Sequence, residues 1–379
     1  MKILAILFHF PPMSGGGVIV AVDIVNNFAK LGHKVTVITP NIEWSGPKFE
    51  AKIDSSIEII RIDVPSKTKI KIAARRCKKN LQKKGEELGK TEQFDFVFTI
   101  FHPFHLAPSA AVACAKKLKI PSIIKIDDAI YEKSTGLKSI QRKIEKIMNA
   151  KTLQNSSKIL VVNEEVKKIV IDYYNIQNEK ILVIPNGVEI SLFKGTKTYD
   201  KKLVLFSGVM YKHRGIDVLL EAAPKVIEKV PEAKFILLGD GDEMNEMKNI
   251  ANQKKIAKNI IFTGWINRDK IPQELKNASI GIGPLKLTTV TKNALPIKVL
   301  EYMASGLPII AKRGTLPKDI LDDGKNGFFI DNVKELEEKL ILLLNNLELN
   351  KQMSKKSIEM IQKFSWEKII ESIIQIHKN

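Results

Sequence analysis

The pattern of apolar residues divides the first half of the chain into short apolar runs separated by longer segments in which apolar residues recur every three to four positions. Runs of this length are typical of buried strands, and the segments between them have the period of helices. Strands alternating with helices predict a doubly wound α/β domain. The runs span residues 2–8, 34–39, 57–62, 94–101, 121–126, 158–162 and 181–184.

The alternation restarts after the polar stretch 194–200. A chain of 379 residues also exceeds the size at which a single hydrophobic core stops growing. We therefore expect two α/β domains, residues 1–195 and 196–363, and a final amphipathic helix within 364–379. The strand candidates of the second domain are 203–206, 234–238, 259–262, 279–283, 308–311 and 327–330.

The cysteine content and the first apolar run bear on where the protein works. Two cysteines, Cys77 and Cys114, argue against a disulfide framework and fit a reducing cytosol. The run from Ile3 to Phe8 is short and is followed by two prolines, so it reads as a buried strand and not as a signal peptide or a membrane span. We expect a cytoplasmic protein.

The formal net charge of +19 is concentrated in one segment. Lys67 to Lys90 holds ten basic and two acidic residues, with a partial apolar stripe over 70–81. Such a segment would be attracted to an anionic membrane, which predicts a peripheral contact on the cytoplasmic face. A solvated helix on a lysine-rich protein is the alternative. Aromatic residues are nearly absent from the segment, which counts against nucleic acid as a partner.

A glycine-rich loop follows the first strand candidate. Gly15, Gly16 and Gly17 precede a helical pattern, and glycine allows the backbone to approach a phosphate at a helix N-terminus. The spacing of the three glycines does not match the dinucleotide-binding motif G-x-G-x-x-G, which disfavours a nicotinamide-dependent enzyme. Ligands of open parallel sheets bind outside the carboxyl ends of the strands, so two such domains facing each other would share one cleft.

The segment 293–308 predicts a sugar-nucleotide site. Pro296 suits the first helical position, and the amides and dipole of a helix start favour an anion. Lys298 and Glu301 are three residues apart and share a helix face, where the lysine can meet a diphosphate and the carboxylate can accept hydrogen bonds from ribose hydroxyls. Gly306 is placed to end this helix. The alternative is a core helix with an incidental Lys/Glu pair.

These residues resemble the retaining, GT-B-fold glycosyltransferases of family 4, in which a Glu, seven residues and a second Glu hold the donor. Glu301 matches the second glutamate, while position 293 is Asn, which still donates and accepts hydrogen bonds. The resemblance implies two Rossmann-like domains facing across a cleft. It also implies a hexosyltransferase that moves a sugar from a nucleotide-diphosphate sugar to an acceptor hydroxyl with retention. Residues 364–379 would cross back to the first domain.

The resemblance extends to the loop that opens the second domain. The family clamps the donor diphosphate there with a Gly-Arg pair and a later lysine. In this chain Gly208 is kept, Val209 replaces the arginine and Arg214 takes the lysine position. Arg214 can bind phosphate bidentately, and Lys212 or Lys298 can supply the missing cation. A surface loop on a basic protein is the alternative.

Two further loops complete the donor site that the resemblance implies. The Asp-x-Asp at 240–242 reads as the family's Gly-Asp-Gly turn and not as a metal site, and Ile266 holds the place of a nucleobase contact. Trp265 can cover the base or pack. The expected donor-binding residues are Gly15, Gly16, Gly17, Gly208, Lys212, Arg214, Gly239, Ile266, Asn293, Leu295, Pro296, Lys298 and Glu301.

The catalytic candidates are Arg214, Lys298, Asp127 and His102. Family members often carry a histidine where this chain has Asp127, and His102 lies in a His-Pro-Phe-His run that is also typical of a structural histidine. The cations would stabilise the leaving diphosphate, so we expect no metal ion or other cofactor.

The acceptor and the precise activity stay open at the level of sequence. We expect a glycan or lipid-linked acceptor in the synthesis of cell-surface polysaccharide, glycolipid or glycoprotein glycans. A GT-B epimerase or phosphorylase is an alternative enzyme. A catalytically degenerate nucleotide-sugar-binding partner subunit is the non-enzymatic alternative, because Val209, Asn293 and Asp127 depart from the family pattern.

Overall fold

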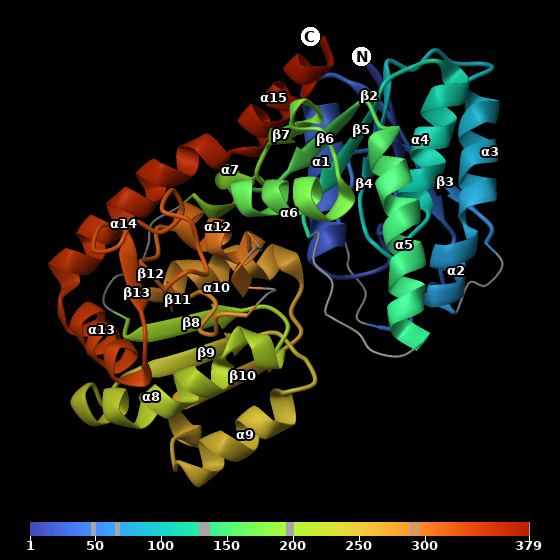
Figure 1. Cartoon of the computed structure of the whole chain (residues 1–379). Helices are drawn as coiled ribbons and strands as arrows, with labels where there is room; N and C mark the ends of the chain where they lie inside the picture. The colour runs from blue at the N-terminus through green and yellow to red at the C-terminus, as the bar shows by residue number, and fades with distance from the viewer. Residues whose placement is uncertain are drawn as a thin grey trace. The chain divides into compact units, whose positions relative to one another are not determined.

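Two units of alternating strands and helices make up the chain in the computed structural model (Figure 1). They comprise Met1–Asn186 with Trp366–Asn379, here called unit 1, and Gly187–Ser365, called unit 2. The structure describes residues 1–46, 51–64, 69–128, 137–194, 201–288, 291–292 and 295–378, without the side chains of 70, 71, 137, 138 and 378.

Unit 1 is built on a seven-stranded parallel sheet in the order β3-β2-β1-β4-β5-β6-β7. The first strand of the chain, an interior strand of this sheet, is buried on both faces, which explains its apolar sequence: Ile3 to Ile6 are 0% exposed. The strands are β1 (Lys2–Ile6), β2 (Lys34–Pro40), β3 (Glu58–Ile62), β4 (Phe96–Ile100), β5 (Ser122–Ile126), β6 (Lys158–Val161) and β7 (Ile181–Val183).

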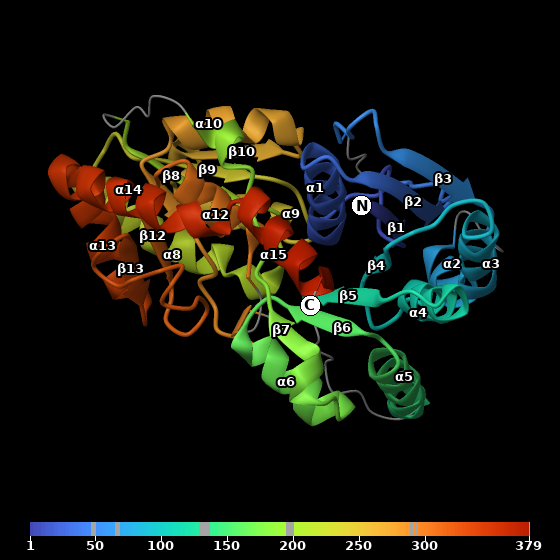
Figure 2. The same ribbon diagram turned by 90° about the horizontal axis from the view of Figure 1, so that it is seen from above.

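Helices cover both faces of this sheet. Helices α1 (Gly16–Lys30) and α15 (Trp366–Lys378) pack together on one side, and α3 (Lys78–Leu88) and α4 (Ala107–Leu118) lie on the other (Figure 2). Trp366 fixes the first pair because its buried Nε1 donates a hydrogen bond to Asp23 Oδ2 at 3.1 Å. The remaining helices are α2 (Ile70–Arg76), α5 (Leu137–Gln154) and α6 (Glu164–Tyr174).

Unit 2 repeats the architecture with a six-stranded parallel sheet in the order β10-β9-β8-β11-β12-β13. Its strands are β8 (Leu203–Ser207), β9 (Lys234–Leu238), β10 (Ile260–Gly264), β11 (Ile280–Ile282), β12 (Ile309–Lys312) and β13 (Gly327–Ile330). Its helices are α7 (Ile190–Phe193), α8 (Ile216–Lys229), α9 (Met244–Gln253), α10 (Ile271–Asn277), α12 (Ile297–Ala304), α13 (Val333–Asn345) and α14 (Leu347–Ile361).

Each of the thirteen strands coincides with an apolar run of the sequence to within two residues at either end, so the α/β prediction is confirmed. In both sheets the strand order reverses beside the first strand, between β1 and β4 in unit 1 and between β8 and β11 in unit 2. Ligands of open parallel sheets bind outside the carboxyl ends of the strands at such reversals. The loops after these four strands are therefore where a site is expected.

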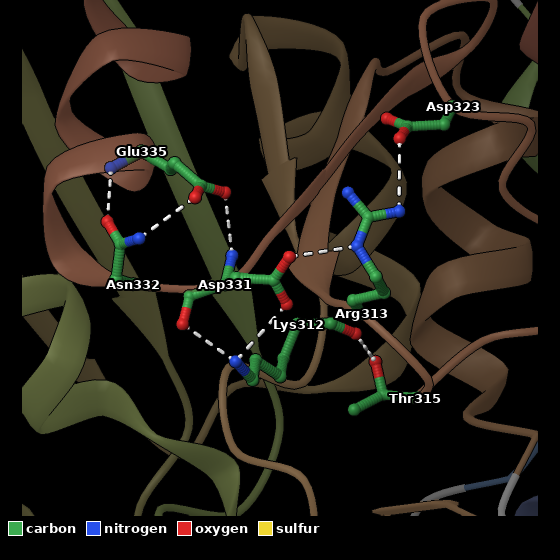
Figure 3. A network of polar contacts seen from close by, with 7 residues as sticks. All are labelled: Lys312, Arg313, Thr315, Asp323, Asp331, Asn332 and Glu335. Atoms are coloured by element: carbon green, nitrogen blue, oxygen red, sulfur yellow. Dashed lines mark hydrogen bonds and ion pairs between the residues drawn. The ribbon is translucent and has the colours of Figure 1, made fainter.

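The ends of β12 and β13 are joined by a polar network (Figure 3). Arg313 Nε lies 2.9 Å from Asp331 Oδ2, and its Nη1 lies 3.3 Å from Asp323 Oδ2. Asn332 begins α13 as its N-cap: its Oδ1 accepts a 2.9 Å hydrogen bond from the amide of Glu335. This cap satisfies a first-turn amide that has no partner within the helix.

The basic segment 67–90, which contains α2 and α3, is expected from its sequence to contact a membrane. Ala73, Ala74, Cys77 and Leu81 are at most 2% exposed, so these four residues of the apolar stripe face the core of unit 1, whereas Ile72 is 37% exposed. Gly85 allows α3 to lie close to α4, because a Cβ there would be 2.7 Å from Cys114 Sγ. Contact of the outward basic side chains with an anionic membrane stays a prediction. None of the helices in the described ranges is long and apolar enough to cross a bilayer.

Candidate active site

The loop after β8 is held in place by a tyrosine from α12. The amide of Ser207 donates a 2.7 Å hydrogen bond to the hydroxyl of Tyr302, which is fully buried. Burial raises the pKa of the Tyr302 phenol above its ordinary value, so the hydroxyl stays protonated. Gly281 makes room for this ring, because a Cβ at position 281 would lie 2.6 Å from it. The carboxyl end of β8 is thereby fixed against α12.

Two glycines bring the loops after β8 and β9 into backbone contact. A Cβ on Gly239 would lie 2.2 Å from the carbonyl oxygen of Gly208, and both glycines have positive φ. The amide of Met210 donates to the carbonyl of Asp240 at 2.9 Å. Asp240 Oδ1 in turn accepts a 2.7 Å hydrogen bond from the amide of Gly241, so this carboxylate serves the turn.

Arg214 stands at the start of α8. It ends a 3₁₀ turn, Lys212–Arg214, and Gly215 follows as the N-cap with a φ of 77°. A Cβ on Gly215 would lie 2.8 Å from the Cβ of Leu285, so the loop after β11 packs closely here. Arg214 is half-buried, and desolvation lowers the pKa of its guanidinium, whereas Lys212 is exposed.

The start of α12 differs from the prediction by one position. Pro296 is the N-cap, with φ −69° and ψ 122°, and the helix begins at Ile297; the expectation that Pro296 occupies the first helical position is wrong. Its fixed φ suits either place, and the extended ψ is what makes it a cap. Leu295, just before it, is 7% exposed. Asn293 lies outside the described residues.

The other end of α12 follows the prediction. Gly306 has a φ of 68°, and its amide donates to the carbonyl of Met303 at 3.0 Å. The amide of Leu307 donates to the carbonyl of Tyr302 at 2.9 Å. This pair of bonds is the Schellman motif, which needs a residue that tolerates positive φ.

Lys298 places a cation in the middle of these loops. Its Nζ is buried, lies 3.5 Å from the centroid of the Phe206 ring, and has no hydrogen-bond partner among the residues that the structure describes. Its stem passes over Gly208, where a Cβ would lie 3.9 Å from Lys298 Cδ. Desolvation, and then the charge of Arg214, hold the pKa of Lys298 well below its ordinary value. Two cations therefore converge on this point.

Glu301 follows Lys298 by three residues on the same helix face. It is 4% exposed, and its Oε1 lies 3.9 Å from Nη2 of Arg268. Arg268, from the turn after β10, was not anticipated from the sequence, because it is one of 61 basic residues and nothing in its surroundings along the chain marks it. The prediction that Lys298 and Glu301 share a face is confirmed by the helix that holds both.

The loop after β10 adjoins the loop after β9. The amide of Gly239 donates to the carbonyl of Gly264 at 3.0 Å, which aligns the two turns. Ile266 is half-buried, and Trp265 is 39% exposed, so part of its surface is open to solvent. Of the expected donor-binding residues, those of unit 2 that the structure describes lie in the loops after β8, β9 and β10 or at the start of α12: Gly208, Lys212, Arg214, Gly239, Ile266, Leu295, Pro296, Lys298 and Glu301.

The glycine loop of unit 1 adjoins a cluster of histidines. Gly15 is the N-cap of α1, and a Cβ on Gly17 would lie 3.7 Å from His9 Nδ1. The ring of His102 stacks on that of His105 at 4.1 Å between centroids, and His9 meets His102 edge-on at 5.1 Å. Burial lowers the pKa of His9 to about 3 and that of His102 to about 4, so both are neutral near pH 7.

His9 was missed because it looks like an isolated residue in the sequence, and His105 was seen only as the end of the His-Pro-Phe-His run. They follow β1 and β4, the two strands beside which the order of the unit 1 sheet reverses. The repeated histidines at 102 and 105 were the available signal.

Asp127 is paired with a lysine from inside the sheet. Its Oδ1 lies 2.9 Å from the Nζ of Lys125, whose side chain is 0% exposed and also reaches the carbonyl of Ile184 at 3.4 Å. Lys125 lies on β5, and Asp127 follows directly after the end of that strand. Lys125 was not anticipated, although a lysine within the apolar run from Ile123 to Ile126 was the visible signal. The negative charge of Asp127 is thus balanced by the positive charge of Lys125.

Two parallel sheets, each with candidate site residues at its strand-order reversal, define a protein of two α/β domains, and comparison with known families identifies its class. The family described as "Glycosyltransferase Family 4" matches residues 14–192, and the family described as "Glycosyl transferases group 1" matches residues 188–360. The chain belongs to the family 4 glycosyltransferases, which have the GT-B fold, and it is a transferase.

Individual relatives are similar to this chain over most of its length. An uncharacterized glycosyltransferase of Methanocaldococcus jannaschii is 23% identical, over 100% of this chain and 98% of that protein. The alpha-monoglucosyldiacylglycerol synthase of Acholeplasma laidlawii is 24% identical, over 91% of this chain and 88% of that protein. The structure of Anabaena HepE in complex with UDP has the same fold, with a TM-score of 0.77 at 15% identity and full coverage of both chains.

Proposed function

We propose that the protein transfers a sugar from a nucleotide-diphosphate sugar to an acceptor hydroxyl with retention, and that the diphosphate binds beside Lys298 and Arg214. The observation that carries this proposal is the buried Nζ of Lys298, which has no hydrogen-bond partner within the described residues. A buried charge without a partner costs several kcal/mol, roughly, in the free protein. Such a cost is expected where a group is held ready for a ligand of opposite charge.

The surrounding groups suit the parts of such a donor. Arg214 can bind two phosphate oxygens through its planar fork, and Lys298 adds a point charge. Gly208 and Gly239 leave the backbone open to close approach, and the start of α12 adds the positive end of its dipole. Glu301, one turn further along α12, is placed to accept hydrogen bonds from ribose hydroxyls.

The electrostatics of these residues support a specific course of reaction. The bond between the anomeric carbon and the diphosphate oxygen breaks, and a bond from that carbon to the acceptor oxygen forms on the same face. Negative charge grows on the leaving diphosphate, which Arg214 and Lys298 stabilise. His102 is neutral and weakly basic, and Asp127 is held by Lys125. We therefore assign the acceptor proton to the departing phosphate, and no metal ion or cofactor is needed to neutralise it.

The acceptor is proposed by class only. The relative from Acholeplasma laidlawii is named for a glycosylated diacylglycerol. We propose a lipid-linked or glycan acceptor in the synthesis of cell-surface polysaccharide or glycolipid, on the cytoplasmic face of the membrane. The free thiols of Cys77 and Cys114 fit a reducing compartment.

Donor binding and turnover test the proposal together. Thermal shift against a panel of nucleotide sugars identifies the donor, because a ligand that binds only the folded state raises its melting temperature. Arg214→Ala, Lys298→Met and Glu301→Ala should each weaken donor binding at least tenfold and reduce turnover. Lys229→Ala, an exposed lysine of α8, removes the same charge away from the site and should change neither. Wild-type donor affinity in all three site variants would refute the assignment.

A degenerate nucleotide-sugar binder is the second candidate. The observation that favours it is that His102 is neutral and Asp127 ion-paired, which leaves the unit 1 candidates without a strong base. Tight donor binding with neither transfer to a pool of lipid-linked and soluble acceptors nor donor hydrolysis would support this function. Release of nucleoside diphosphate that depends on an added acceptor would exclude it.

A further inference from the structure

Helix α5 exposes an apolar stripe to solvent. Ile140, Ile144, Ile147 and Met148 are 58%, 55%, 69% and 44% exposed. They recur every three or four residues and therefore lie along one side of the helix. Scattered exposed apolar residues are ordinary, but a continuous stripe of four on one helix marks an interaction surface.

The opposite face of α5 is polar and faces the protein. Arg142 lies over the ring of Phe104, with its Cζ 4.5 Å from the centroid, and Asn149 donates a 3.0 Å hydrogen bond to the carbonyl of Pro103. Lys146 Nζ lies 4.2 Å above the ring of Tyr173. An ordinary surface helix buries its apolar face and exposes its polar one. In α5 the four residues of the stripe are exposed instead, although Leu153 near the end of the helix is buried, and these contacts hold the helix in that orientation.

Basic side chains surround the stripe. Lys143 and Lys151 are exposed on α5 itself. Glu145 of α5 forms an ion pair with Arg75 of α2 at 3.4 Å, which joins α5 to the basic segment (Figure 1). Along that segment a surface hollow is lined by Arg75, Arg76, Lys78, Lys79, Gln82, Lys83 and Glu86. The surface formed by the stripe of α5 and this basic face of α2 and α3 is here called the α5 surface.

We propose that the α5 surface docks on an anionic lipid bilayer, with the isoleucine stripe inserted among the headgroups. A bilayer of anionic lipid offers negative charge to the lysines and apolar acyl chains to the stripe at the same level. A second copy of the chain would bring two basic surfaces together, which is unfavourable. Nucleic acid would leave the stripe exposed to water. The charges of α5 suit a helix lying in the interface and not one that spans it.

This inference goes beyond the transfer reaction and stands independently of it. It also shifts the expected membrane contact toward α5, since Ala73, Ala74, Cys77 and Leu81 of the 67–90 segment are buried while the stripe of α5 is open. The basic side chains of α2 and α3 would add electrostatic attraction, and α5 would supply the insertion.

Vesicle binding of the full chain is the test. Co-sedimentation is measured with vesicles of phosphatidylcholine alone and with 30% phosphatidylglycerol, at about 50 and 500 mM salt, where screening differs strongly. The wild type should bind the anionic vesicles at low salt and lose most binding at high salt. Ile144→Ser/Ile147→Ser should reduce the partition coefficient at least tenfold, and Lys143→Gln/Lys151→Gln several-fold. Leu347→Ser/Ile358→Ser, at exposed positions of α14, is the matched control and should bind like the wild type.

Insertion of the α5 stripe into the bilayer is measured separately with a fluorophore. Ile147→Cys can be labelled alone, because Cys77 and Cys114 are buried and burial raises the pKa of each thiol to about 12. An environment-sensitive dye at 147 should shift to the blue on anionic vesicles. No wild-type binding at low salt, or equal binding by the isoleucine variant, would overturn the proposal. So would dimerisation that the isoleucine variant abolishes in the absence of lipid. Donor-induced thermal shift should be unchanged in every α5 variant, which separates this test from that of the transfer site.

Discussion

Replacing Lys298 with methionine should stabilise the free protein. The substitution keeps an unbranched stem and removes the buried cation that has no hydrogen-bond partner in the described part of the chain. Exchanging buried charges for apolar groups of similar volume has stabilised other proteins by about 1–4 kcal/mol, even where the charges were paired. The loss of the cation–π contact with Phe206 offsets part of this gain. We therefore expect an increase of about 1–2 kcal/mol in the free energy of unfolding.

The same substitution should weaken the response to a nucleoside diphosphate. Loss of a charge-assisted hydrogen bond costs about 1.5–3 kcal/mol, which raises Kd about 10- to 100-fold. At a ligand concentration of about 100 times the wild-type Kd, the wild type gains about 2.7 kcal/mol of stability. The variant would gain only about 0.4–1.4 kcal/mol under the same conditions. Lys298→Met should thus melt higher than the wild type without ligand and shift less with it.

Differential scanning fluorimetry with and without nucleoside diphosphate measures both effects, at about 2–4 °C for each kcal/mol in a unit of this size. Lys125→Met is the matched control, because Lys125 Nζ is also buried but is paired with Asp127 at 2.9 Å. Removing that lysine leaves a carboxylate unpaired and should destabilise by about 3 kcal/mol. The two substitutions therefore have opposite expected signs. A Lys298→Met protein that is less stable than the wild type without ligand, or equally shifted by it, would refute the reasoning.

Three further results are expected. Binding of a nucleoside diphosphate should raise the depressed pKa of Lys298, so proton uptake is expected only at pH values above the pKa that Lys298 has in the free protein; calorimetry in buffers of different ionisation enthalpy measures it, and it should be absent in Lys298→Met. The pKa values of His9 and His102 are about 3 and 4 in the folded chain, below the value of about 6.5 in the unfolded chain. The unfolded chain therefore binds more protons, and the free energy of unfolding should fall as pH drops from about 6.5 to 4. Thermal melts of His102→Phe should show a smaller loss. Asn332→Ala removes the hydrogen bond to the amide of Glu335 and should cost about 1 kcal/mol in urea unfolding, whereas Asn332→Asp, which keeps the cap, should cost little.

The sheets were predictable from the sequence because most strand positions are apolar. A strand covered by helices on both faces is apolar at most positions, and such runs are visible without knowledge of their neighbours. The glycine at 306 was predictable for a similar reason, since a helix end that needs positive φ selects glycine locally. Both are features that one short segment determines by itself.

The partners of the site residues were not predictable in this way. Arg268 reaches Glu301 from another strand end, and Lys125 holds Asp127 inside the sheet. Each pair depends on how segments meet in three dimensions, which periodicity does not report. The same limit explains the basic segment: the sequence shows that 70–81 carries a partial apolar stripe, but it does not show that Ala73, Ala74, Cys77 and Leu81 are turned toward the core.

The two units also differ in how they balance charge, and this difference fits the two substrates of a transferase. At the strand-order reversal of unit 2, Lys298 and Arg214 face each other and the buried Nζ of Lys298 has no hydrogen-bond partner in the described ranges, which favours an anion. At the reversal of unit 1, the histidines are neutral, and Asp127, after the next strand, is matched by Lys125. Neutral histidines and a paired carboxylate suit hydroxyl groups, which need hydrogen bonds and not counter-ions. The charges of these residues therefore support the proposal that the diphosphate binds to unit 2 and the sugar hydroxyls of an acceptor bind to unit 1.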